Sequence, residues 1–171
     1  MERSPIDIRP YESSDYDASR ALCVELAEHH RLIYDSPGIG GDDPGAWWNG
    51  LLESSVRIGS WVAVEGGTVI GLAGLQTTDE EGVEVEPIIV STAARGRGVG
   101  RLLMERLIIE SLERGFGSLS VRSVARNTGA LAAWPAMGFT TVGLVEVFKV
   151  LEESETEWRP GVVIDGMSFD H

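Results

Sequence analysis

Glycine and arginine alternate in segment 95–101, "RGRGVGR", which stands between an apolar run at 83–91 and a leucine-rich run at 97–114. The first run predicts a strand and the second a helix, so the segment should lie where a helix begins. There the first amide groups have no partner within the helix, and the helix dipole adds partial positive charge. Glycines leave the backbone open to a ligand, and arginines attract anions. The segment therefore predicts a phosphate-binding site, most simply for a diphosphate.

Two common phosphate-binding motifs do not fit this segment. A Walker A loop needs a Gly-Lys pair, and segment 95–101 contains no lysine. The dinucleotide pattern G-x-G-x-x-G needs a third glycine where this chain has Arg101 or Leu103. A glycine-rich turn with solvated arginines stays open as the structural alternative.

Residues 95–100 match the motif R/Q-x-x-G-x-G/A, and in this stretch the chain resembles the GNAT superfamily of acyl-CoA-dependent N-acetyltransferases. The stretch 126–139, "RNTGALAAWPAMGF", is similar to that family's second signature, in which an asparagine precedes a short helix and a terminal Gly-Phe. The order of predicted elements is similar too, so the resemblance covers nearly the whole chain. It implies a mixed α/β fold and an enzyme that uses acetyl-CoA as its cosubstrate.

The resemblance also implies where the cosubstrate binds. Backbone amides of the turn would hold the coenzyme A diphosphate, in a segment formed by Arg95, Gly96, Arg97, Gly98, Val99, Gly100 and Arg101. The strand end Ile88, Ile89 and Val90 would pair its backbone with the pantetheine arm, where the two central strands splay apart. The amide of Val90 is the implied oxyanion donor. Asn127 would contact the same arm, cap the helix that follows it, or do both.

Acetyl transfer to an amine needs a base, because a lysine-like amine of pKa ~10.4 is almost fully protonated at neutral pH. Glu84 and Glu86 alternate on the predicted strand, so both side chains should lie on one face. In several relatives a glutamate on this strand is the general base, and counting back from the turn places Glu84 nearest that position. The alternative is a solvated acidic edge, because the segment 79–81 is acidic too.

The chain departs from the family pattern at Trp134, where many relatives carry the tyrosine that protonates the departing thiolate. An indole N–H only donates and is not usefully acidic, so Trp134 cannot take that role. A thiol of pKa ~8.5 leaves tolerably as a thiolate, so the departure need not abolish catalysis. We interpret Trp134 as a wall that packs against the cofactor arm.

Five other residues could carry chemistry, but each has a simpler interpretation. Cys23 is expected to be a small buried apolar residue rather than a catalytic thiol. His29 and His30 would border the acceptor site or would simply be solvated at a helix end. The pair at 47–48, two tryptophans, would line the acceptor site or would pin a loop to the core. The spacing of His, Cys and Asp predicts no metal site.

The elements that must position these residues follow from the apolar pattern. Predicted helices cover 14–34, 46–55, 97–114 and 128–138, and predicted strands cover 6–11, 60–67, 68–77, 83–91, 118–124, 139–151 and 161–169. Gly66-Gly67 should turn a hairpin between the second and third strands. The order predicts a mixed α/β sheet. The resemblance implies the GNAT fold, a central mixed sheet flanked by about four helices, in a single GNAT domain over 1–171.

Composition limits the partners. The net charge of −13 argues against a nucleic-acid partner and mildly favours a cationic acceptor, such as a polyamine, an aminoglycoside-like molecule or a protein amine. No apolar window is long enough for a membrane span, and the single cysteine suggests a reducing compartment, so we expect a cytoplasmic protein with no membrane partner. Dimers are frequent in the family, so a homodimer is compatible with the resemblance.

We therefore predict an N-acetyltransferase that moves an acetyl group from acetyl-CoA to a primary amine by direct attack in a ternary complex. The alternative is a non-catalytic module of the same fold that binds or senses acyl-CoA, and the missing tyrosine keeps it open.

Overall fold

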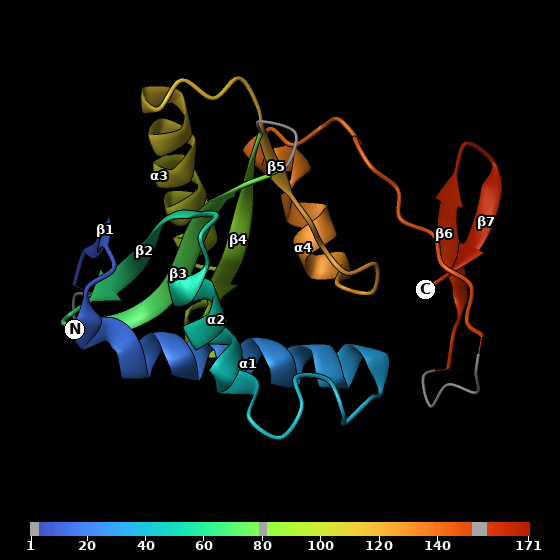
Figure 1. Ribbon diagram of the computed structural model, residues 1–171, viewed down its shortest axis with the longest axis horizontal. Coiled ribbons are helices and arrows are strands. Elements are labelled where there is room, and N and C mark those ends of the chain that lie inside the picture. The colour runs from blue at the N-terminus through green and yellow to red at the C-terminus, as the bar shows by residue number, and fades with distance from the viewer. Residues whose placement is uncertain (1–3, 79–81, 152–156) are drawn as a thin grey trace. The chain divides into compact units, whose positions relative to one another are not determined.

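The computed structural model describes residues 4–78, 82–151 and 157–171 (Figure 1). The chain divides into two compact units: unit 1 is Met1–Ala27 with Gly40–Arg122, and unit 2 is Glu28–Ile39 with Ser123–His171. The single domain over 1–171 stays a prediction.

Unit 1 contains a five-stranded sheet in the order β1-β2-β3-β4-β5. Its strands are β1 (Ile6–Pro10), β2 (Arg57–Glu65), β3 (Thr68–Thr77), β4 (Val83–Val90) and β5 (Leu119–Val121). The first four pair antiparallel, and β5 runs parallel to β4. The predicted mixed sheet is therefore confirmed, and so is the hairpin at Gly66-Gly67, where both residues have positive φ.

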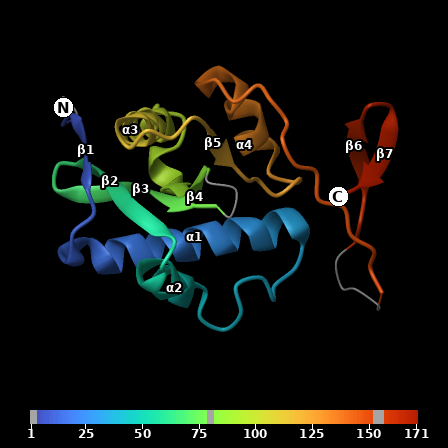
Figure 2. The ribbon, with the colours of Figure 1, turned by 45° about the horizontal axis from the view of Figure 1, so that its top comes forward.

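Four α-helices occur among the described residues: α1 (Tyr16–Tyr34), α2 (Trp47–Glu53), α3 (Val99–Glu113) and α4 (Thr128–Ala133). Within unit 1, α3 covers one face of the sheet, and α2 with the first part of α1 covers the other (Figure 2). On the α1 face the core cluster contains Leu22, Cys23, Trp48, Val62, Leu72 and Ile89. On the opposite face α3 lies so close that a Cβ at Gly71 would stand 3.0 Å from the side chain of Leu103.

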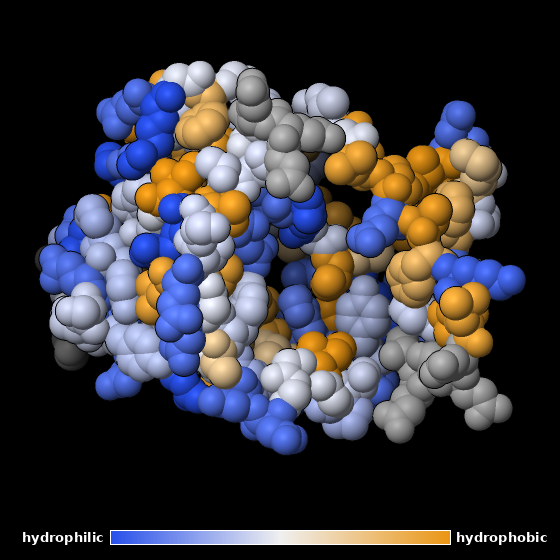
Figure 3. Space-filling view, in the orientation of Figure 1, coloured by the Kyte–Doolittle hydropathy of each residue, from blue (hydrophilic) through white to orange (hydrophobic). Residues whose placement is uncertain are grey.

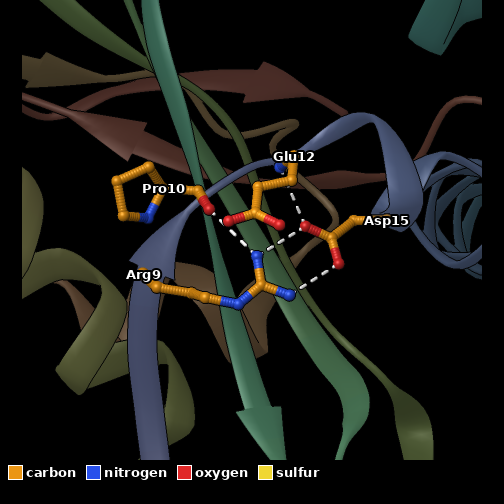
Figure 4. A network of polar contacts seen from close by, with 4 residues as sticks. All are labelled: Arg9, Pro10, Glu12 and Asp15. Atoms are coloured by element: carbon orange, nitrogen blue, oxygen red, sulfur yellow. Dashed lines mark hydrogen bonds and ion pairs between the residues drawn. The ribbon is translucent and has the colours of Figure 1, made fainter.

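The start of α1 is fixed by an ion pair (Figure 4). The guanidinium of Arg9 donates to both carboxylate oxygens of Asp15 at 2.7 Å, and the amide of Glu12 donates to the same carboxylate at 2.9 Å. These hydrogen bonds to the charged form hold the pKa of Asp15 below its usual range, although burial opposes them. The network ties β1 to the turn that leads into α1.

A β-bulge interrupts the pairing of β3 with β4. Leu75 pairs with Val85 and Ala73 pairs with Ile88, so Gly74 stands opposite two residues of β4, Glu86 and Pro87. A Cβ at Gly74 would lie 2.5 Å from the carbonyl oxygen of Glu86, so only glycine fits there. The extra residue changes the alternation of side chains along β4 beyond this point.

Unit 2 differs from the prediction. The segment 139–151 is not a strand: its described residues have no regular structure, and most of its apolar side chains are exposed. β-Branched residues favour a strand, but a strand also needs a neighbour for its backbone groups, and a local pattern cannot supply one. Figure 3 shows apolar side chains gathered on the surface of this unit.

The predicted strand 161–169 is instead a hairpin of β6 (Pro160–Ile164) and β7 (Met167–Asp170). Asp165 and Gly166 form its turn with positive φ at both residues. Asp-Gly between apolar runs is a strong hairpin signal, and this signal was present in the sequence. Arg126 is buried in unit 2 and donates to the carbonyl oxygens of Ile33 and His171.

Candidate functional site

The glycine-arginine segment is a turn that leads directly into α3. Gly96 and Gly98 have φ values of 72° and 81°, a left-handed conformation that favours glycine, and Gly98 is the residue at the N-cap of the helix. The first helical bond runs from the amide of Leu102 to the carbonyl of Gly98. The amides of Val99 and Gly100 therefore come before the regular bonding of the helix. A Cβ at Gly96 or Gly98 would meet nothing within 4 Å, so the backbone here is open to a ligand.

The arginines of this segment are held in place by other groups. Arg97 forms an ion pair with Glu65 at the end of β2, and Arg101 forms one with Glu105 one turn further along α3. Arg95 donates from Nε to the carbonyl oxygen of Val90 at 3.3 Å. The charges of Arg97 and Arg101 are thus partly balanced by carboxylates. The alternative of simple solvated arginines does not describe Arg97, whose side chain is only 23% exposed.

Glu25 of α1 anchors the chain just before the turn. Its carboxylate accepts from the amide of Thr92 at 2.8 Å and from the hydroxyl of Thr92 at 3.0 Å. Sequence reasoning missed Glu25, because no local pattern links residues 67 positions apart. This contact places the start of α3 relative to the first helix within unit 1.

One edge of β4 is open beyond its first three residues. β5 pairs only with Val83–Val85, so among the described residues no strand covers the remainder of that edge. The amide of Ser91 donates to the carbonyl of Ile70, which makes these two residues a hydrogen-bonded pair. By the alternation of an antiparallel ladder, Ile88 and Val90 then point their backbone groups away from β3.

The predicted backbone contacts of the strand end can therefore be sorted by residue. Ile88 and Val90 present an amide and a carbonyl toward the open edge, whereas Ile89 uses its groups on β3 and packs its side chain in the core. The amide of Val90, which is the predicted oxyanion donor, points into this opening. Contact of these residues with a pantetheine arm stays a prediction, and the backbone geometry allows it at Ile88 and Val90 but not at Ile89.

The two glutamates of β4 lie in different environments. Glu84 is 3% exposed and forms an ion pair with Arg122, whose Nε lies 3.3 Å from Oε1 of the carboxylate. Burial and, to a smaller extent, the charge of Glu84 raise the pKa of Glu86 to about 7, although the charge of Arg122 lowers it. Neither residue belongs to a solvated edge, so that alternative is wrong for them. Residues 79–81, on which it also rested, lie outside the described residues.

Cys23 and the tryptophan pair follow the simpler interpretations. Cys23 is buried in the core cluster, where burial and the charge of Glu86 raise the pKa of its thiol to about 12. It is therefore not a nucleophile at neutral pH. Trp48 is fully buried and packs edge-on against Tyr11, so it pins its segment to the core, while Trp47 is 40% exposed.

Unit 2 holds the remaining predicted site residues. The side chain of Asn127 accepts from the amide of Ala130 at 3.2 Å, so its role as an N-cap of α4 is confirmed. The indole N–H of Trp134 donates to the hydroxyl of Ser123 at 2.8 Å, which uses its single donor. His29 and His30 lie side by side on α1, and burial lowers the pKa of His30.

The described residues contain no group of three or more His, Cys, Asp and Glu side chains placed to hold a metal ion. In the same part of the chain, every helix is too short or too polar to cross a lipid bilayer.

Comparison with known proteins decides the family. The model of the acetyltransferase (GNAT) family matches residues 23–139, which takes in α3, β4 and the second signature. The chain belongs to the GNAT acetyltransferase family. A curated GNAT relative, the N-alpha-acetyltransferase RimI of Mycobacterium tuberculosis, is 39% identical over 133 residues, which cover 75% of each chain. The N-acetylaspartate synthetase of Xenopus tropicalis is 28% identical over 50% of this chain and 32% of that protein.

Solved structures confirm the GNAT fold. A complex of the aminoglycoside N-acetyltransferase AAC(6')-Iy with a bisubstrate analogue of CoA aligns with a TM-score of 0.64 and 21% identity, covering 86% of this chain and 99% of that one. The ribosomal-protein-S18-alanine N-acetyltransferase of Escherichia coli aligns with a TM-score of 0.58 and 19% identity, covering 78% and 77%. At such identities the likeness concerns the fold alone.

Proposed function

We propose that this GNAT protein transfers an acetyl group from acetyl-CoA to a primary amine by direct attack in a ternary complex. The observation that carries the proposal is Glu86: a largely buried carboxylate of pKa about 7 on β4, the strand whose open edge bears the amide of Val90. A base must be ionised in part at working pH and still hold a proton well, and a pKa near 7 satisfies both.

The turn at the start of α3 is the proposed seat of the coenzyme A diphosphate. Three features support this: the open backbone at Gly96 and Gly98, the unbonded amides at the helix end, and the arginines around them. The open edge of β4 at Ile88 and Val90 would bond the amides of the pantetheine arm as another strand would. Such pairing would bring the thioester beside Val90.

An α-amine is the acceptor that we favour. Its pKa of about 7.7–8.0 is within about one unit of that of Glu86, whereas a lysine amine near ~10.4 is much harder to deprotonate. The relative of 39% identity bears the name of an N-alpha-acetyltransferase. We therefore propose the N-terminal amine of a peptide or protein as the acceptor. An aminoglycoside is the less favoured acceptor, because only the similarity in fold supports it.

The proposed reaction has four steps. The carboxylate of Glu86 takes a proton from the ammonium group, directly or through one water. The free amine attacks the thioester carbon, and the amide of Val90 donates to the oxyanion that forms. The C–S bond then breaks, and coenzyme A leaves as a thiolate, which gains its proton from solvent or from Glu86. The attacking nitrogen loses its second proton to solvent, and the products are an acetamide and free coenzyme A.

A thiol-release assay with acetyl-CoA tests this function. Peptides with a free α-amine, a lysine amine only, and an aminoglycoside form the acceptor panel. We expect turnover with the first and a loss of about 10²–10⁴-fold in kcat for Glu86→Gln. Glu113→Gln is the matched control, because Glu113 is an exposed glutamate at the end of α3.

Coenzyme A binding, measured by calorimetry, separates the remaining outcomes. Binding without turnover on any amine would favour the non-catalytic sensing module instead. The absence of binding to the folded protein would contradict both.

A further inference from the structure

The pairing of β4 with β5 brings three charged side chains close together: Glu84, Glu86 and Arg122. Glu84 pairs with Ser120 and Val85 with Val121, in parallel. The pairing ends at Val85 and Val121. Arg122, the next residue, forms an ion pair with Glu84, and its charge acts on Glu86, which shares the face of Glu84. The cluster lies where β5 stops pairing with β4, at the inner end of the open edge.

Within this cluster the cation contacts one carboxylate directly. Nε of Arg122 lies 3.3 Å from Oε1 of Glu84, and the two side chains are 73% and 4% exposed. A carboxylate buried to that degree is costly without a partner. Glu84 is therefore the paired carboxylate and Glu86 is the one left to exchange a proton.

We propose that Arg122 is a positioning residue for acceptor activation: its ion pair fixes the buried Glu84 carboxylate beside Glu86 and balances part of the negative charge that Glu86 experiences. This inference rests on the proposed function, because it assigns a role in a base-catalysed step. Arg122 acts through Glu84 and does not itself touch the reacting atoms. Glu84, the sequence's first candidate for the base, becomes part of its support.

Other charged and titratable groups face Glu86 as well. From α1, Cys23 lies close enough for the charge of Glu86 to raise the pKa of its thiol, and Arg20 acts on the same thiol in the opposite direction. From α2, Trp48 shares the core cluster of Cys23 and carries no charge. With a pKa of about 12, Cys23 stays neutral across the pH range of the test.

The test is the acidic limb of the pH profile of kcat/KM. The charge of Arg122 lowers the pKa of Glu86 and that of Glu84 raises it, so removing each should move the limb in opposite directions. Arg122→Gln should move the midpoint of the acidic limb to higher pH by about half a unit or more. The expected shift is smaller than the 1–3 units of a close buried ion pair, because the side chain of Arg122 is exposed. Glu84→Gln should move the midpoint to lower pH, and Arg122→Lys should restore the wild-type limb.

The matched control is Arg114→Gln. Arg114 is an exposed arginine that pairs with a carboxylate of low exposure, Glu110, at the far end of α3. The variant Arg114→Gln removes the same charge from unit 1 as Arg122→Gln does. If the acidic limb of kcat/KM moved equally in both variants, the proposal would be overturned. A limb that stays in place in Arg122→Gln, or that Arg122→Lys fails to restore, would do the same.

A titration of the carboxyl groups by NMR provides a second readout without turnover. The signal of Glu86 is identified by its absence in Glu86→Gln, and its midpoint should shift as the limb does. Should the wild type bind coenzyme A but acetylate nothing, the proposed reaction fails while these midpoints still decide the role of Arg122. If Arg122→Gln does not fold, Arg122→Met, which keeps the aliphatic stem, takes its place; a Glu86 midpoint unchanged in a folded variant contradicts the inference.

Discussion

At the scale of single residues, burial separates two glutamates that look alike in sequence. Glu84 and Glu86 differ by two positions and share a face, but among the described residues an arginine lies within ion-pair distance of Glu84 and not of Glu86. Because no such ion pair in the described part of the chain stabilises the charged form of Glu86, its burial raises the pKa of its carboxyl group. The same property that suits a base should weaken the fold.

This conflict predicts a pH-dependent gain of stability in Glu86→Gln. The pKa of Glu86 rises from 4.5 to about 7 on folding. The stability that the protonated side chain contributes to the folded wild type is therefore fully present below about pH 4.5 and is lost as the pH rises through about 7. Glutamine is neutral throughout. The difference in free energy of unfolding, Glu86→Gln minus wild type, should therefore grow as the pH rises. We expect this difference to be about 1–3 kcal/mol larger at pH 8 than at pH 4.5.

Urea unfolding of both proteins at several pH values measures this difference, and other groups that titrate cancel between the two curves. A difference between the two proteins that is the same at every pH would show that Glu86 is not perturbed by folding.

At the scale of elements, the turn into α3 and the bulge of β4 decide the site. The turn needs left-handed backbone at Gly96 and Gly98, and Glu25 holds its start from α1. The bulge needs Gly74, because the carbonyl of Glu86 occupies the place of its Cβ. Both elements thus require glycine, the turn because its backbone is left-handed and the bulge because it has no room for a side chain.

Gly100→Ala separates folding from binding at the turn. An added Cβ would meet only Val90 Cγ2 at 3.6 Å, an ordinary contact, and alanine is favoured over glycine in a helix by about 0.5–1 kcal/mol. We expect an unchanged or higher melting temperature and a Kd for coenzyme A raised about tenfold, or about 1.4 kcal/mol, because the methyl group intrudes on the diphosphate.

Gly50→Ala in α2 is its control. A Cβ at Gly50 meets nothing within 4 Å, so this variant should gain stability with no change in Kd. A Gly100→Ala protein that binds coenzyme A as tightly as the wild type would remove the turn from the proposed binding site.

At the scale of the whole molecule, the net charge of −13 should favour cationic acceptors over a long range. Raising the salt from about 0.01 to about 0.15 M shortens the screening length from about 30 to about 8 Å. We expect the KM of a peptide with basic residues behind its α-amine to rise several-fold over this range, with kcat nearly constant.

A peptide of equal length with acidic residues is the comparison, and its KM should fall over the same range. Equal salt dependence for the two peptides would show that the charge of the chain does not act on the acceptor.

The sequence by itself determined the family, the order of elements in unit 1 and the turn with its glycines. These follow from local rules, since periodicity, turn residues and a contiguous motif are each read within a few positions. The helix-capping role of Asn127 was likewise open to prediction, because the cap and the helix are adjacent.

Only the tertiary structure decided which carboxylate is paired, which amides of β4 are open and where segment 139–151 differs from a strand. The pairing of Glu84 with Arg122 depends on the register of β4 with β5, and the direction of the Val90 amide depends on that of β3 with β4. Registers and strand partners join positions far apart in the chain. Burial and unscreened charge follow from those contacts, so the properties that distinguish Glu86 as a base arise only once the sheet has formed.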